Sequence, residues 1–185
     1  MYLTWQRGKA MAAAWGTRSP SFLSPVRQEL RAFPSLCDTL GHVNNARYLD
    51  LVGLGRFEWF ARLGAGPRLL RERYTYLIAG AALTYRREIP RWSRFSLQTQ
   101  LVEYDERWVC FLSSFELVQD GATRVAARAL TRGQLRRRDG TGSLPTLLQA
   151  MDVMAEPCPP LAEDLAAQLE AQNLTVDVIR RHEGR

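Results

Sequence analysis

The sequence contains few histidines and cysteines, which build metal sites and disulfide frameworks, and it is poor in lysine. Lysine occurs once, at Lys9, histidine twice, at His42 and His182, and cysteine three times in 185 residues. Three cysteines that lie far apart fit neither a disulfide framework nor a paired zinc motif, which favours a reducing compartment such as the cytoplasm. We therefore expect no metal and no cofactor.

Long apolar runs are missing as well. No stretch approaches the roughly 18 consecutive apolar residues that a membrane-spanning helix needs. Residues 1–25 contain no Asp or Glu, and their apolar run at 11–15 is too short for the core of a secretory signal. We interpret residues 1–25 as the N-terminal extension of a cytoplasmic protein, with import into an organelle as the less favoured alternative.

Arginine, in contrast, is abundant and gives the chain a net charge of +6. Its planar guanidinium suits nucleic acid and also a phosphate-bearing small ligand such as coenzyme A, while a genomic bias toward arginine is a third explanation. No recognisable nucleic-acid-binding motif is present, so we do not expect a nucleic-acid partner. Apolar residues make up 46% of the chain, enough for the core of one domain.

Hydrophobic periodicity predicts an α+β protein. Alternating or apolar runs between turn residues predict five strands, at residues 26–33, 74–89, 95–102, 109–117 and 125–135. Asp120-Gly121 is a hairpin signal between the last two strands. A helical pattern covers residues 45–63, and an amphipathic helix at 161–172 follows a Pro-rich segment. The predicted domain spans residues 26–138, and 139–185 form a tail.

The helix at 45–63 has two features that can be checked. One stripe is predicted to be solvated: Arg47, Asp50, Leu54, Glu58 and Arg62. Within this stripe, Glu58 and Arg62 are spaced for an i,i+4 ion pair. Gly53 and Gly55 each destabilise a helix by about 1 kcal/mol relative to Ala. Their presence predicts that the helix comes close to the sheet or to a ligand.

The most informative stretch is residues 38–49, D-T-L-G-H-V-N-N-A-R-Y-L, which leads directly into this helix. Burying an acid, a histidine and two asparagines beside a helix destabilises the fold unless these groups are paired or take part in chemistry. The first turn of a helix leaves N–H groups unpaired and carries partial positive charge. The stretch therefore combines a carboxylate with a site for an anion or a developing oxyanion.

The pattern D-x-x-G-H-V-N-N-A-x-Y-L resembles that of the hot-dog-fold thioesterases, in the 4-hydroxybenzoyl-CoA thioesterase-like superfamily. It is nearest the thioesterase superfamily member six-like branch. The acyl-ACP thioesterases have a similar motif, D-x-N-x-H-V-N-N, in which Leu40 stands at the place of the middle asparagine. The resemblance extends more weakly from about Arg27 to Arg137. One helix wrapped by about five antiparallel strands is the hot-dog order of elements.

The resemblance implies roles for three residues of the motif. Asp38 would attack the thioester carbonyl as nucleophile or activate water as general base. The backbone N–H of Asn45 would stabilise the oxyanion. His42 would orient the acid or carry a proton, with a purely structural role as the alternative. The alternatives for Asp38 and Asn45 are an Asx turn to Leu40 or Gly41 and simple helix capping.

The resemblance also implies a ligand and an assembly. The ligand would be an acyl-CoA or acyl-ACP thioester, and the predicted substrate-binding residues are Gly41, Asn44, Tyr48, Arg86, Arg87 and Arg91. The arginines would clamp phosphates, unless they form an ordinary solvated strand end. A tunnel for the acyl chain would be lined by Leu49, Val52, Phe57 and Phe60. The chain would form a homodimer, or a dimer of dimers, with each site at the subunit interface.

Two alternatives remain at this stage. Because Leu40 replaces a functional asparagine, a non-catalytic acyl-binding or scaffold protein of the same fold is the alternative to a hydrolase of lipid metabolism. Cys37, adjacent to Asp38, could be a nucleophile, but no second nearby histidine supports a Cys–His pair. We therefore predict that Cys37 is a buried thiol.

Overall fold

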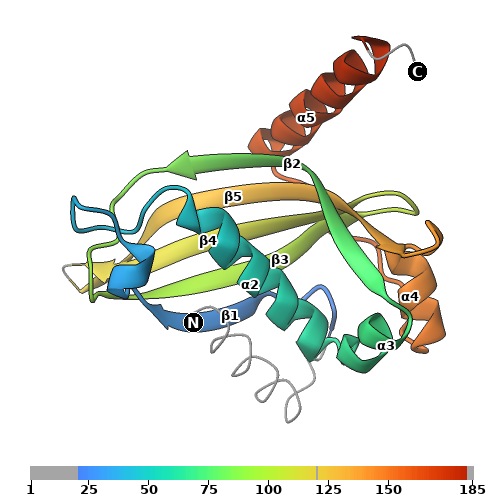
Figure 1. Ribbon diagram of the computed structural model, residues 1–185, viewed down its shortest axis with the longest axis horizontal. Coiled ribbons are helices and arrows are strands. Elements are labelled where there is room, and N and C mark those ends of the chain that lie inside the picture. The colour runs from blue at the N-terminus through green and yellow to red at the C-terminus, as the bar shows by residue number, and fades with distance from the viewer. Residues whose placement is uncertain (1–20, 120, 183–185) are drawn as a thin grey trace.

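The computed structural model describes residues 21–119 and 121–182. The predicted N-terminal extension thus lies outside the described residues, except for 21–25. The described chain forms one five-stranded antiparallel sheet with a long helix, α2 (Arg47–Arg62), across its concave face (Figure 1). The strands are β1 (Val26–Arg31), β2 (Tyr74–Tyr85), β3 (Arg94–Tyr104), β4 (Val109–Gln119) and β5 (Ala122–Arg137).

The strand order is β1-β3-β4-β5-β2, so β2 and β1 are the two edges. All five predicted strands are present, although β2 ends at Tyr85 rather than at residue 89. β2 pairs with β5 along its length, with one bulge between Ile78 and Gly80. Its other side carries no strand of the described chain, and Leu77 and Ile78 are 54% and 48% exposed. β2 is therefore a long apolar edge.

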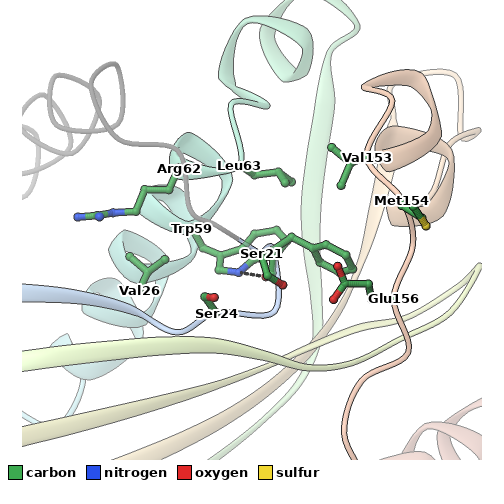
Figure 2. A pocket seen from close by; sticks show the side chains of 10 residues that line it. Ser21, Ser24, Val26, Trp59, Arg62, Leu63, Val153, Met154 and Glu156 are labelled. Atoms are coloured by element: carbon green, nitrogen blue, oxygen red, sulfur yellow. Dashed lines mark hydrogen bonds between the residues drawn. The ribbon is translucent and has the colours of Figure 1, made fainter.

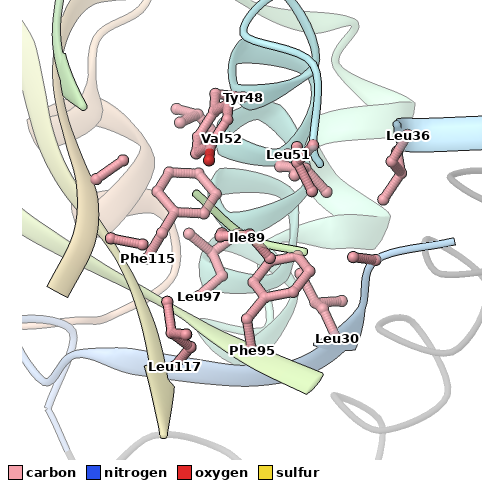
Figure 3. Packing of buried hydrophobic residues seen from close by; sticks show 14 of the residues in the cluster. Leu30, Leu36, Tyr48, Leu51, Val52, Ile89, Phe95, Leu97, Phe115 and Leu117 are labelled. Carbon is pink, nitrogen blue, oxygen red and sulfur yellow. The ribbon is translucent and has the colours of Figure 1, made fainter. Parts of the chain in front are cut away.

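The core has two clusters on the concave face of the sheet. The first surrounds the N-terminal half of α2, where Leu51 and Val52 meet Phe95, Leu97 and Phe115 of the sheet (Figure 3). The second surrounds its C-terminal half and contains these side chains: Trp59, Phe60, Phe111, Leu144, Leu147 and Leu148. The last three belong to α4 (Leu144–Ala150), so residues beyond the predicted domain end at 138 complete this core.

A third cluster lies on the outer face of the sheet. There Leu165 and Leu169 of α5 (Glu163–His182) pack on Val102, Cys110 and Leu130. The predicted apolar stripe of this helix is thus confirmed, but the helix continues beyond the predicted end at residue 172. Figure 1 shows α5 beginning beside β2 and extending past that edge of the sheet.

Two short helices were not predicted. They are α3 (Gly66–Arg71) and α4, and each has a proline in its first turn. Proline is favoured in the first turn of a helix, but in a short segment of sequence the same residue predicts a turn. The α4 start is also capped, since the Ser143 hydroxyl accepts a hydrogen bond from the Thr146 N–H at 3.2 Å.

The predicted solvated stripe of α2 is wrong in its middle. Leu54 is fully buried and Glu58 is only 5% exposed. Glu58 receives hydrogen bonds from Arg62, at 2.7 Å, and from the Gln28 side chain on β1. The predicted Glu58–Arg62 pair is confirmed, but it lies between α2 and β1 rather than in solvent.

Gly55 and Gly53 differ in what surrounds them. A Cβ added at Gly55 would overlap the Thr99 hydroxyl of β3, whereas at Gly53 it would meet only the end of Arg56, at 3.8 Å. The close approach predicted from the glycines is therefore confirmed at Gly55 alone. It sets the distance between the middle of α2 and the sheet.

This contrast gives a stability prediction. Gly55→Ala should destabilise the fold by about 1–3 kcal/mol, because the extra methyl group overpacks the helix–sheet contact. Gly53→Ala, the matched control, should be neutral or stabilise by up to about 1 kcal/mol, because it removes only a helix-interior glycine. Urea unfolding of both variants measures the difference. Equal effects of the two changes would contradict a close contact at Gly55.

Candidate functional site

The motif loop is a tight turn that links the 3₁₀ helix η1 (Pro34–Leu36) to α2. Its two arms form a bridge between Cys37 and Val43, and the Asp38 N–H donates to the His42 carbonyl at 3.1 Å. Gly41 has φ +87°, in the left-handed region that glycine adopts without strain. Gly41 thus allows the loop to turn back on itself.

Asp38 is partly buried, with 23% of its side chain exposed. Its Oδ1 accepts a hydrogen bond from the Leu40 N–H at 3.0 Å, which is the predicted Asx turn. Its Oδ2 lies 3.7 Å from His42 Nδ1. One oxygen thus orients the carboxylate on the loop, while the other faces the imidazole.

His42 lies between two carboxylates. Beyond the contact with Asp38, its Nδ1 is 3.4 Å from the Val43 carbonyl, and its Nε2 is 3.9 Å from Glu88 Oε1. The imidazole is 19% exposed. Sequence reasoning missed Glu88, because nothing in its local pattern indicates that the connection between β2 and β3 returns to the motif loop.

Backbone pairing brings this connection to the motif. The Val43 N–H donates to the Ile89 carbonyl at 2.9 Å, and His42 forms a β-bridge with Pro90. The Arg91 N–H donates to the Gly41 carbonyl at 2.8 Å. Since Val43 and Ile89 are 1% and 0% exposed, the junction is a buried, rigid part of the site.

The start of α2 supplies the proposed oxyanion donor. Asn44 Oδ1 accepts from the Ala46 N–H at 2.9 Å, which orders the chain just before the first turn of α2. The Asn45 carbonyl accepts from the Tyr85 hydroxyl at 3.1 Å. Among residues 21–119 and 121–182, none accepts a hydrogen bond from the Asn45 N–H. Tyr85 thus holds the peptide that follows Asn45, while the Asn45 N–H, which belongs to the preceding peptide, remains available, as an oxyanion donor requires.

Tyr48 lies beneath this start rather than at the surface. Its ring is 2% exposed and packs edge-on against Tyr85 and Phe115, with centroids at 5.0 and 4.8 Å. Burial raises the pKa of Tyr48 to about 12. Tyr48 thus supports Tyr85, and its contact with substrate stays a prediction. Sequence reasoning also missed Tyr85, whose alternation on β2 signals only a half-buried strand.

The three predicted arginines have different surroundings. The guanidinium of Arg91 lies 3.4 Å from the Asp38 carbonyl oxygen. Arg87 donates to the Val125 carbonyl at 3.2 Å and so ties the connection to β5. Arg86 is exposed at the end of β2. Arg91 is thus at the motif loop, and Arg86 and Arg87 are at the neighbouring strand end.

Cys37 is half-buried and donates to the Ala32 carbonyl at 3.8 Å. Burial raises the pKa of its thiol, although nearby Arg91 acts in the opposite direction. The thiol is therefore protonated at neutral pH, as expected of a packing residue rather than a nucleophile. Within the described part of the chain, no cluster of three or more His, Cys, Asp or Glu side chains could hold a metal ion.

A cavity of about 220 Å³ lies at the other end of α2 (Figure 2). Trp59, Leu63 and Val153 line it, with Arg62 and Glu156 at its polar side. It does not include the motif. Two of the residues predicted to line the acyl tunnel, Val52 and Phe60, lie in the two core clusters, and the tunnel itself stays a prediction.

The order of the strands and the motif loop can now be compared with known proteins. A family model described as the thioesterase-like superfamily matches residues 34–169. The chain belongs to this superfamily. Its fold is the hot-dog fold of solved thioesterases. One of these, a mutant 4-hydroxybenzoyl CoA thioesterase complexed with 4-hydroxybenzoyl CoA, has a TM-score of 0.58 at 13% identity, over 64% of this chain and 88% of that one.

Two proteins named THEM6 are similar in sequence. The one from Danio rerio is 26% identical over 177 residues, which cover 92% of this chain and 85% of that protein. The one from Drosophila melanogaster is 31% identical over 86 residues, 46% of this chain and 45% of that protein. The match thus spans less than half of the Drosophila relative. No helix among the described residues is long and apolar enough to cross a membrane.

Cysteine reactivity tests the packing role of Cys37. Its raised thiol pKa predicts that iodoacetamide alkylates it more slowly at neutral pH than a free cysteine, and that the rate rises with pH. Burial raises the pKa of Cys158 to about 11 and of Cys110 to about 12, so these should react still more slowly. Mass spectrometry of each site measures the rates. A Cys37 that outpaces free cysteine would indicate an activated nucleophile.

Proposed function

We propose that this thioesterase-like protein hydrolyses acyl-CoA thioesters at the motif loop. Asp38 is the nucleophile or general base, and the Asn45 N–H is the oxyanion donor. The observation that carries the proposal is the arrangement of the loop: a carboxylate with one oxygen directed to His42, followed by an unbonded N–H at the start of α2. The thioester carbonyl would lie between them.

The chemistry can follow either of two routes. As general base, Asp38 takes a proton from water, whose oxygen attacks the carbonyl carbon; the C–S bond breaks and the proton passes to the leaving thiolate. As nucleophile, Asp38 forms an acyl anhydride and releases the thiolate, and water then hydrolyses the anhydride. In both routes the negative charge grows on the carbonyl oxygen, beside the positive end of α2.

His42 supports either route as a positioning residue. Its Nδ1, which is 3.4 Å from the Val43 carbonyl and 3.7 Å from Asp38 Oδ2, would help to keep the carboxylate in place, while Nε2 lies 3.9 Å from Glu88. An imidazole at this place can carry a proton to the leaving sulfur.

Arg86 and Arg91 are the candidate contacts for the coenzyme A phosphates. Both are exposed at the end of the molecule that holds the motif. The structural neighbour complexed with 4-hydroxybenzoyl CoA supports a coenzyme A thioester as ligand class. Arg87 instead donates to the Val125 carbonyl and holds the β2–β3 connection against β5.

A non-catalytic acyl-binding or scaffold protein is the second candidate. It is supported by the Asx turn, which engages one oxygen of Asp38, and by Leu40, which is 79% exposed and brings no polar group to the site. In that case the motif would serve only to shape the loop and cap α2.

Hydrolysis by Asp38 and Cys37 variants separates the two candidates. Asp38→Ala should lower kcat for acyl-CoA hydrolysis by about 10²–10⁴-fold, as expected when a positioned acid–base group is lost. Cys37→Ala, a change at the adjacent residue, should keep most of the activity. Release of free coenzyme A across a range of acyl lengths is the measurement, with melting curves as the folding control. No turnover by the wild type, or equal turnover by both variants, would favour the binding protein.

We also propose that the chain forms a homodimer through β2. An exposed apolar edge strand favours pairing with another strand. β2 has twelve residues, and Ile78 and Tyr85 are 48% and 44% exposed. Pairing of two β2 strands would continue the sheet across both subunits and cover these side chains. It would also place the second subunit beside Tyr85, which holds the Asn45 peptide.

A charge on the edge tests this assembly. Ile78→Lys should raise the dimer Kd by about tenfold or more, because it places a charge on the apolar edge of each subunit. Leu70→Lys is the matched control, since Leu70 is 75% exposed but belongs to α3 and not to β2. Light scattering over a concentration series measures the dimer Kd of each variant. A wild-type monomer, or equal effects of the two changes, would contradict the β2 interface.

A further inference from the structure

One end of the molecule combines exposed apolar side chains with a high density of arginine. The motif loop and the β2–β3 connection both lie there (Figure 1), and three large apolar residues are exposed: Leu40 by 79%, Trp92 by 50% and Val118 by 70%. Scattered exposed leucines are ordinary on protein surfaces, but a group that includes tryptophan indicates an interaction surface.

Strand pairing shows why these residues gather. β1 ends at Arg31 opposite Arg94, where β3 begins, and Ser96 of β3 faces Glu116 near the end of β4. The connection that follows β2 is hydrogen-bonded to the motif loop through Arg91 and Gly41. The ends of β1, β2 and β4 and the starts of β3 and β5 thus meet at this end, which we call the motif end.

Trp92 is held outward by its own backbone and its neighbours. It has φ +68°, a conformation that a bulky residue rarely adopts, and its N–H donates to the Ala32 carbonyl at 2.7 Å. Its ring packs edge-on against Phe33 and lies under the Arg31 guanidinium. The Trp92 ring is therefore held outside the core, and Trp92 is 50% exposed.

The charge of the motif end is positive. The exposed arginines are Arg31, Arg86, Arg91, Arg94 and Arg124. The acids of the same described segments are Glu29, Asp38, Glu88 and Glu116, and both Glu29 and Glu116 lie in salt bridges with Arg27. An apolar tip that includes tryptophan, set among arginines, matches the interfacial zone of an anionic lipid layer.

We propose that the motif end docks on the surface of an anionic membrane, with Leu40 and Trp92 inserted among the headgroups and the arginines against lipid phosphates. The docking is peripheral. It extends the proposed function, because Leu40 is two residues from Asp38 and docking would bring acyl groups dissolved in the membrane to the motif. It does not depend on turnover, since docking is measured by binding alone.

Vesicle flotation with the full-length chain tests the docking. The wild type should bind phosphatidylcholine vesicles that contain phosphatidylserine, and should bind pure phosphatidylcholine more weakly because the arginines then lack anionic partners. Added salt should weaken binding to the anionic vesicles. A wild type that does not float with anionic vesicles would overturn the proposal.

A matched pair of double variants locates the contact. Leu40→Gln with Trp92→Gln should lower the partition coefficient by about tenfold or more, equivalent to ~1.4 kcal/mol. Leu70→Gln with Met154→Gln is the control at the opposite end, where both side chains are also exposed, by 75% and 83%. The control should change binding less than twofold, roughly within the effect of a surface substitution. Melting curves establish that both variants are folded.

Three results would overturn the proposal. Equal loss in both double variants would mean that apolar exposure in general drives flotation. Unchanged binding of the Leu40/Trp92 variant would place the membrane contact elsewhere in the chain. A change of this variant's mass in light scattering, without a change in flotation, would identify the motif end as a subunit contact. Failure of the proposed hydrolysis, with flotation as expected, would leave the docking surface in place.

Discussion

The candidate site depends on the backbone pairing between the motif loop and the β2–β3 connection. The Val43 N–H to Ile89 carbonyl bond and the Arg91 N–H to Gly41 carbonyl bond join two segments that are far apart in sequence. Each such bond contributes only about 1 kcal/mol net. Their effect is mainly geometric, because Val43 and Ile89 are buried and the pairing places Glu88 and Arg91 beside Asp38 and His42.

The position of α2 is the second constraint on the site. Gly55 lets the helix lie against β3, and Tyr48 fixes its first turn under Tyr85 and Phe115. Tyr85 then holds the Asn45 carbonyl, one peptide after the Asn45 N–H, which has no acceptor among the described residues. The proposed oxyanion donor is thus oriented from the edge strand β2. A second subunit at that edge would stabilise this orientation further.

The two proposals place related chemistry at one end of the protein. An acyl-CoA carries phosphates and an apolar chain, and the motif end offers arginines beside exposed Leu40 and Trp92. The same pairing that assembles the Asp38–His42–Glu88 group also brings Arg91 and Trp92 to the surface next to it. Substrate binding and membrane docking would therefore share a single rigid platform formed by two loops.

The sequence by itself determined the five strands, the central helix and the motif, because local alternation and helical periodicity report which side of an element is apolar. It also identified Asp38, His42 and Asn45 as neighbours, since they lie within one turn of chain. It could not show that Leu54 and Glu58 are covered by β1, that α4 completes the core, or that Tyr48 is buried. Nor could it bring Tyr85 and Glu88 to the site. Those features depend on contacts between distant segments, and only the tertiary structure, through the pairing of strands and the packing of α2, decided them.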